Sequence, residues 1–180
     1  MDDPFAILGL PRQFNINSDE LQQRFIAAAA KWHPDRSCDP LEQSPSAEMA
    51  ARVNEAYRLL SDPETRANVL LELMGGLGSE HKKINLPPQV MAEMMDKREK
   101  LEDATTKGDH EQIKKIQAWI ANERKARLER IGKWFEPLEH CQNNELKTHP
   151  AVERDEIIGK IRMEIDALRY VTRLGEHLSF

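Results

Sequence analysis

Three consecutive residues, His33, Pro34 and Asp35, bring together an imidazole, a helix-breaking ring and a carboxylate in the stretch "AAAAKWHPDRSCDP". An imidazole beside a carboxylate can act as a general base that activates a nucleophile. That chemistry also needs a nucleophile or a substrate pocket beside it. The sequence shows neither a glycine-rich nucleophile turn nor a paired carboxylate site. The pattern therefore argues against a hydrolytic His–Asp pair.

A metal site is the second chemistry that these side chains could support. Such a site needs at least three protein ligands, and His33 and Asp35 have only Cys38 close by in the sequence. The remaining histidines are scattered singly, at positions 81, 110, 140, 149 and 177. Cys38 and Cys141 belong to no CxxC pair and are interpreted as free thiols in a reducing compartment. The alternative interpretation, a purely structural turn in which Pro34 ends a helix, stays open.

The overall composition narrows the classes of partner. The net charge of −5 argues against binding nucleic acid through bulk attraction to phosphate. Residues 1–75 carry seven Lys and Arg against twelve Asp and Glu, whereas residues 76–180 carry nineteen of each. No window approaches the roughly 18 consecutive apolar residues of a membrane span. We therefore expect a soluble, cytoplasmic protein without nucleic-acid or membrane partners.

The residues on both sides of His33 are predicted to be helical. The first half should contain helices at about 3–9, 18–33, 46–60 and 63–73. In the second of these, Leu21 and Phe25 share one face, and Arg24 and Lys31 flank it. The second and third helices should form an antiparallel hairpin closed by a loop over residues 33–45. This arrangement places the three residues at the foot of the hairpin.

The second half of the chain is predicted to contain three long helices joined by short loops, an up-down-up bundle. Gly108 suits the end of the first of them, and Asp109 with Gln112 resembles a capping box that opens the next. Pro150 lies near the start of the last. No convincing period-2 strand is present, so the fold should be all-α. The expected organisation is an N-terminal domain over 1–75, a Gly- and Pro-containing linker over 76–87 and a bundle over 88–180.

The order of motifs in the first half resembles a J-domain, the module with which co-chaperones stimulate the ATPase of Hsp70-class chaperones. A helix with "FAILGL" precedes one ending "KWHPD", and "VNEAYRLLSDPETR" follows about 20 residues later. The resemblance implies that His33, Pro34 and Asp35 form the contact that triggers ATP hydrolysis in the partner. It also implies a basic patch made of Arg24, Lys31 and Arg36.

Two further stretches resemble the HscB family, the J-domain co-chaperones of iron–sulfur cluster biogenesis. They are "RANVLLELMGG" at residues 66–76 and "LRYVTRLGEHL" near the C-terminus. The resemblance implies an HscA-like chaperone and an IscU-like cluster scaffold protein as partners, the latter held on the C-terminal bundle. It implies no enzyme activity, and no cofactor, since the chain lacks a thiolate set. A J-protein for another client, or a scaffold that no longer activates a chaperone, stays an alternative.

The same resemblance implies which residues contact the scaffold protein. They are Met91, Ala92, Met95, Asp96, Glu99, Asp103 and Tyr170, where Ala92 stands in place of a larger apolar residue. On a helical wheel, Val90, Met94 and Leu101 face the bundle core, with the two methionines beside them and the acids further round. The wheel alone leaves open that both methionines only widen the core face.

The last helix is expected to have two distinct faces. Ile158, Ile161, Ile165 and Leu168 share one face, and Met163 and Tyr170 lie on roughly the opposite one. An aromatic side chain that points away from the core indicates a second contact surface. Trp119 and Trp134 are expected to pack in or near the bundle.

Overall fold

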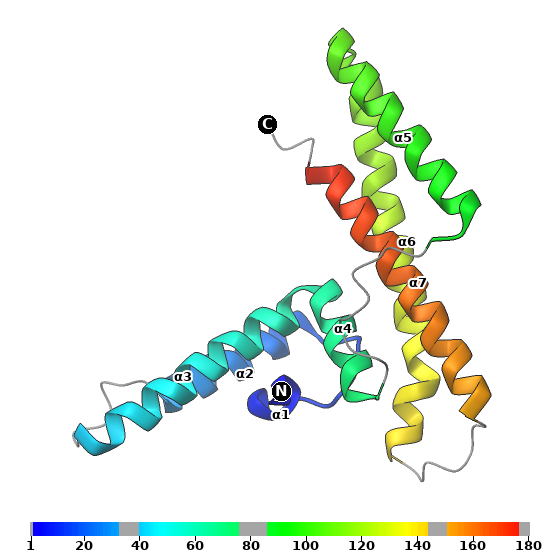
Figure 1. Ribbon diagram of the computed structural model, residues 1–180. Coiled ribbons are helices and arrows are strands. Elements are labelled where there is room, and N and C mark those ends of the chain that lie inside the picture. Colours follow the sequence, from blue (N-terminus) through cyan, green and yellow to red (C-terminus); the bar gives the residue numbers. More distant parts are fainter. Residues whose placement is uncertain (1, 33–39, 76–85, 144–150, 177–180) are drawn as a thin grey trace. The chain divides into compact units, whose positions relative to one another are not determined.

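The computed structural model describes residues 2–32, 40–75, 86–143 and 151–176, giving the backbone alone for 40–44, 140–143 and 151–153. Throughout these ranges the regular elements are α-helices, which confirms the all-α prediction (Figure 1). The chain divides into two compact units, Met1–Gly78 and Ser79–Phe180. Within the described ranges, no helix has the length and apolar character that crossing a membrane requires.

The N-terminal unit contains four helices. They are α1 (Pro4–Leu8), α2 (Ser18–Lys31), α3 (Pro40–Ser61) and α4 (Pro63–Leu73). The side chains of Asp3, Asn17 and Asp62 accept hydrogen bonds from the first free N–H groups of α1, α2 and α4. Gly9 ends α1 with a φ of 64°, a left-handed conformation that favours glycine.

Helices α2 and α3 lie side by side as the predicted hairpin (Figure 1). The rings of Phe25 and Tyr57 stack between them, with centroids 4.2 Å apart. The core of the unit gathers apolar side chains from α1, α2, α3, α4 and the segment between α1 and α2. It comprises Phe5, Leu8, Leu10, Phe14, Leu21, Val53, Ala56, Leu60, Ala67, Val69, Leu70, Leu71 and Met74.

Arg66 joins three segments of this unit. Its guanidinium donates to the carbonyl oxygen of Leu60 at 2.9 Å and to that of Phe14 at 2.8 Å, and it lies 5.7 Å from the Phe14 ring centroid. Burial lowers the pKa of Arg66, against a smaller opposing effect of the Asp62 carboxylate. Arg66 thus ties the end of α3 and the segment that precedes α2 to α4.

The start of α3 differs from the prediction. The helix begins at Pro40, not near residue 46, and it contains Pro45. The prediction placed a loop here because proline normally ends a helix. Pro45 is only the sixth residue of α3, so its missing N–H removes one intrahelical hydrogen bond near an end where the first donors are free in any helix.

The C-terminal unit contains the three expected helices, α5 (Pro88–Lys107), α6 (His110–Asn143) and α7 (Ala151–Glu176). Gly108 follows α5 with a φ of 67°, as its predicted role at the helix end requires. The Asp109 carboxylate accepts a hydrogen bond from the Gln112 N–H at 3.0 Å. Pro150 lies outside the described residues.

The bundle core contains apolar side chains from all three helices. Its buried members are Met94, Leu101, Ala104, Ile116, Ile131, Phe135, Leu138, Ile157, Ile158, Ile161, Ile165, Ala167, Leu168, Val171 and Leu174. Trp119 and Trp134 are half-buried, in agreement with the prediction. Each indole is covered by a lysine, Lys97 at 5.3 Å and Lys160 at 4.7 Å from the ring centroid.

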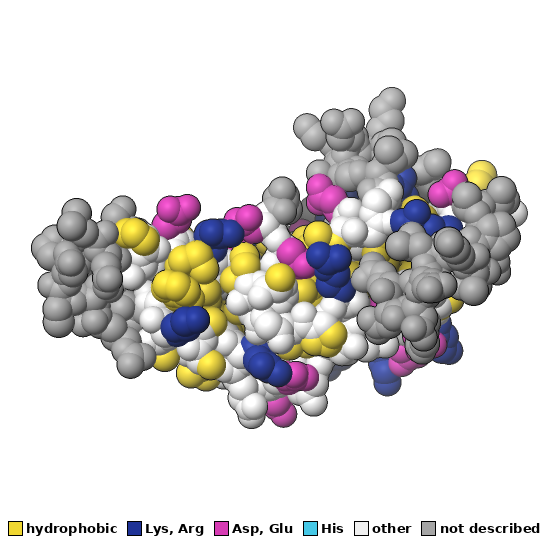
Figure 2. All heavy atoms as spheres, turned by 90° about the horizontal axis from the view of Figure 1, so that it is seen from below, with side chains coloured by type: hydrophobic (Ala, Val, Ile, Leu, Met, Phe, Trp, Pro, Cys, Tyr) yellow, Lys and Arg dark blue, Asp and Glu magenta, His cyan; other side chains and the backbone are white. Residues whose placement is uncertain are grey.

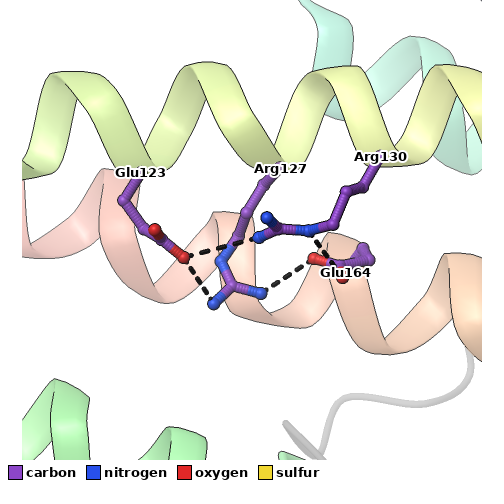
Figure 3. Close-up of polar contacts among 4 residues, drawn as sticks. All are labelled: Glu123, Arg127, Arg130 and Glu164. Carbon is purple, nitrogen blue, oxygen red and sulfur yellow. Dashed lines mark hydrogen bonds and ion pairs between the residues drawn. The ribbon is translucent and has the colours of Figure 1, made fainter.

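An ion-pair network lies between α6 and α7 in this unit (Figure 3). Arg127 bonds Glu164 of α7 at 2.8 Å and Glu123 at 2.7 Å, and Arg130 bonds Glu164 at 2.9 Å. The Arg127 and Glu164 side chains are each only 7% exposed. Glu164 thus has a guanidinium against each carboxylate oxygen, which compensates for its removal from water.

Candidate partner-binding surfaces

The first predicted surface belongs to α2 and the residues that follow it. Arg24 and Lys31 are both exposed on α2, seven residues apart and therefore on one side of the helix. Arg24 lies 3.5 Å from Glu20, and the Lys31 ammonium lies 5.0 Å from the Trp32 ring centroid. His33, Pro34, Asp35 and Arg36 lie outside the described residues, so their predicted roles remain predictions.

The second predicted surface lies on α5. Met94 and Leu101 are buried as the wheel predicts, while Met95 is 60% exposed and Met91 is half-buried. The alternative that both methionines only widen the core is therefore wrong for Met95. Ala92 is exposed beside them and leaves the surface shallow at that position.

The predicted acidic residues continue around α5 from the methionines. Asp96, Glu99 and Asp103 are exposed and lie within about 60° of one another around the helix, taking about 100° per residue. Asp96 pairs with Lys100 at 2.8 Å, and Asp103 pairs with Lys107 one turn later. Glu99 has no ion-pair partner in the part of the chain that the structure describes. Its carboxylate is therefore the one of the three that has no protein cation beside it.

Tyr170 of α7 joins this surface through Arg98. The Arg98 guanidinium bonds Glu102 at 2.8 Å, and Glu102 raises its pKa, with a smaller contribution from Tyr170 in the same direction. Tyr170 therefore lies beside this part of α5. Met95 and Arg98 are three residues apart, so the aromatic ring, the cation and the exposed thioether lie on neighbouring positions.

Tyr170 and Met163 are half-buried, whereas the isoleucines on the other face of α7 are buried. Helix α7 contacts both α6 and α5. Arg98 was absent from the predicted set. Its spacing of three residues from Met95 and seven from Met91 could have indicated it, whereas the influence of Tyr170 on its pKa is visible only in the structure.

The side chains described here suit protein recognition. An exposed thioether, a half-buried aromatic ring and a rim of charged groups are typical of an interface with an apolar centre. In the described ranges, no group of three or more His, Cys, Asp or Glu side chains could hold a metal ion.

Two family models together cover most of the chain. The DnaJ domain matches residues 3–69, and the HSCB C-terminal oligomerisation domain matches residues 86–179. The first match falls on the unit that contains α1 to α4, and the second falls on the unit that contains α5 to α7.

Curated relatives and solved structures agree with these matches. The co-chaperone protein HscB homolog of Burkholderia multivorans is 34% identical over 134 residues, which is 73% of this chain and 76% of that protein. That of Bordetella avium is 38% identical over 105 residues, 57% of this chain and 62% of the relative. The crystal structure of human HscB has a TM-score of 0.78 at 22% identity and covers 99% of this chain and 81% of its own. HscB from Vibrio cholerae has a TM-score of 0.67 at 24% identity, with coverages of 98% and 99%.

A J-domain followed by a three-helix bundle defines a co-chaperone of Hsp70-class chaperones. The match of the bundle to the HSCB C-terminal domain, together with the curated relatives, identifies which co-chaperone family this is. The chain belongs to the HscB co-chaperone family. It acts in iron–sulfur cluster assembly, and its chaperone partner is of the Hsp70 class.

Proposed function

We propose that the chain couples two specific partners, an HscA-like chaperone and an IscU-like iron–sulfur scaffold protein. The J-domain stimulates ATP hydrolysis by the chaperone through His33, Pro34 and Asp35, aided by Arg24, Lys31 and Arg36. The bundle holds the scaffold protein on the α5 surface with Tyr170. The chain performs no catalysis of its own and works in the cytoplasm.

One observation supports the scaffold surface above the others. Met95 is 60% exposed in a bundle whose other large hydrophobic side chains are, over the described residues, buried or half-buried. It lies between the aromatic ring of Tyr170 and the acidic residues of α5. An apolar centre gives affinity when it is desolvated, and the carboxylates around it select a partner with basic groups.

The salt bridges on α5 refine the contribution of each acid. Asp96 and Asp103 each already form an ion pair with a lysine four residues later in α5. Exposed ion pairs of this kind contribute little to stability. Glu99 is free to pair with a cation of the scaffold protein. We therefore assign the main charged contact to Glu99, and a secondary one to Asp96 and Asp103.

Replacing Met95 and Tyr170 together by alanine should weaken scaffold binding strongly. Each apolar or aromatic anchor lost from a well-packed interface costs on the order of 1–4 kcal/mol. Stimulation of the chaperone ATPase without scaffold should stay at the wild-type level, because both residues lie in the other unit. Isothermal titration calorimetry with the purified scaffold protein measures the change.

The control for this variant is Glu129→Ala, an exposed position on α6. It should bind the scaffold protein like the wild type. Equal affinities for the double variant and the wild type, with both folded by circular dichroism, would mean that the scaffold protein binds elsewhere on the chain. Binding of another client in place of the scaffold would favour the J-protein with a different client.

A further inference from the structure

Two charged side chains are buried in the contact between α6 and α7. On the face that Figure 2 shows, Lys, Arg, Asp and Glu side chains lie at the surface, as charged groups in proteins usually do. Arg127 of α6 and Glu164 of α7 depart from this rule, and over the described residues they are the charged side chains that are buried. An apolar pair of similar volume would serve stability at least as well.

Glu164 interrupts an apolar seam of α7. Buried residues follow one another along this helix at alternating spacings of four and three residues, the pattern of a helix that packs lengthwise against another. They are Ile157, Ile161, Glu164, Leu168 and Val171. Glu164 is the middle member of this seam, and the other four members are apolar.

Arg127 occupies the matching place in α6. Ile131, Phe135 and Leu138 follow it at spacings of four, four and three residues, and all three are buried. The two charges therefore lie on the faces that the helices turn toward each other (Figure 3). Arg127 bonds one carboxylate oxygen of Glu164 at 2.8 Å, and Arg130 bonds the other at 2.9 Å.

The arrangement is not the best one for stability alone. Among the residues that the structure describes, the buried Nε of Arg127 has no hydrogen-bond partner. A buried donor without an acceptor lowers stability. Buried charges kept under such conditions favour a role in selecting one packing arrangement, and fixing the register of paired helices is the best-attested role of this kind.

An apolar seam alone does not fix the register of two helices. Isoleucine, leucine and valine side chains can replace one another in a packed core at little cost, so sliding α7 by one turn, about 5.4 Å, still buries apolar groups. The same slide would bring Ile161 or Leu168 opposite Arg127. It would leave the charges of Arg127 and Glu164 buried and unpaired, which is strongly unfavourable. The network is therefore satisfied in one register.

The register of α7 decides where Tyr170 lies. Tyr170 follows Glu164 by six residues, about 9 Å along the helix. In the register of this structure it acts on Arg98 of α5, whose pKa is raised mainly by Glu102 and in smaller part by Tyr170. A slide of α7 by one turn would carry the aromatic ring about 5.4 Å along the bundle axis and away from this position.

We propose that Arg127, Arg130 and Glu164 are positioning residues that lock the register of α7 and thereby hold Tyr170 in place for the scaffold protein. This inference rests on the proposed function, which assigns Tyr170 to the scaffold contact. The locked residues touch no partner themselves, and they act by excluding the slipped alignments that the apolar seam would allow.

The first test compares an apolar and a polar replacement of the network. Arg127→Met, Glu164→Leu should keep a urea midpoint near that of the wild type, because apolar side chains of similar volume can replace a buried ion pair. Its dissociation constant for the purified scaffold protein should rise about 5-fold or more, which means that at most about a fifth of the molecules hold the binding-competent register. Arg127→Gln, Glu164→Gln keeps hydrogen bonds that one register satisfies, so it should retain most of the affinity.

Spin labels report the register directly. Lys133 of α6 and Arg173 of α7 are exposed, and in antiparallel helices they lie on opposite sides of the network along the bundle axis. Nitroxides are attached to Lys133→Cys and Arg173→Cys in a chain with Cys38→Ser and Cys141→Ser. Double electron–electron resonance should give one distance for the otherwise unchanged chain. The apolar variant should add a second distance that differs by about 5 Å, close to one helical turn.

Each outcome decides for or against the lock. A single, unchanged distance in the apolar variant would overturn the proposal, and so would a second distance accompanied by unchanged scaffold affinity. Loss of the helical circular dichroism spectrum in that variant would also overturn it, because the network would then hold the fold and not select a register. If the Met95→Ala, Tyr170→Ala variant bound the scaffold protein as tightly as the wild type, the proposed function would fail, while the label distances would still test the register.

Discussion

Replacing His33 by glutamine should reduce stimulation of the chaperone ATPase to the unstimulated rate. The substitution keeps a polar side chain of similar reach but removes the imidazole that the J-domain motif supplies. The DnaJ domain model matches the residues around the motif, so the loss is expected at the chaperone contact. Steady-state phosphate release by the chaperone, with and without the co-chaperone, measures the effect.

The matched control is His110→Gln, the same exchange at an exposed position of the other unit. It should stimulate like the wild type, and both variants should retain the helical circular dichroism spectrum. Undiminished stimulation by His33→Gln would contradict the assignment of the motif. If the wild type itself failed to stimulate the chaperone, the chain would be a scaffold that binds without activating.

Replacing Arg127 by alanine should lower the free energy of unfolding of the C-terminal unit by about 3–5 kcal/mol. Removing one partner of a buried ion pair leaves the other charge uncompensated, and such losses are of this order. Glu164 is 7% exposed and would keep only Arg130, while Glu123 would lose its 2.7 Å contact. Because Arg130 stays, the lower end of the range is expected.

Urea unfolding followed by tryptophan fluorescence measures this loss, because Trp119 and Trp134 lie in the affected unit. Lys115→Ala, which removes an exposed ion pair with Glu111, is the control and should leave the unfolding midpoint unchanged. The double variant Arg127→Met, Glu164→Leu should recover most of the lost stability, because apolar side chains of similar volume can replace a buried pair. A loss below about 1 kcal/mol for Arg127→Ala would show that the network contributes little.

The helices were largely predictable from the sequence because their ends carry strong local signals. Gly108 and Asp109 mark the junction between α5 and α6, and Asp62-Pro63 marks the start of α4, all as predicted. The start of α3 was not predicted, because Pro45 is a local signal for a helix end that the surrounding helix-forming residues override.

The features of the structure that could not be predicted from the sequence depend on contacts between helices. Glu123 and Arg127 are four residues apart and could be paired by inspection, but their partner Glu164 depends on the register of α7 against α6. In the same way, the methionines and acids of α5 could be placed on a wheel, whereas Arg98 joined the surface only through Tyr170 of another helix.

The separate cores of the two units have an evolutionary consequence. Substitutions that share no packing partners change stability almost independently, so a change in the α5 surface is not felt by the residues that hold α2. Selection can therefore alter the proposed client-binding surface of the bundle while the J-domain stays the same. On the proposed assignment, a lineage that acquires a different scaffold protein changes side chains on α5 and α7 and keeps the chaperone that it already has.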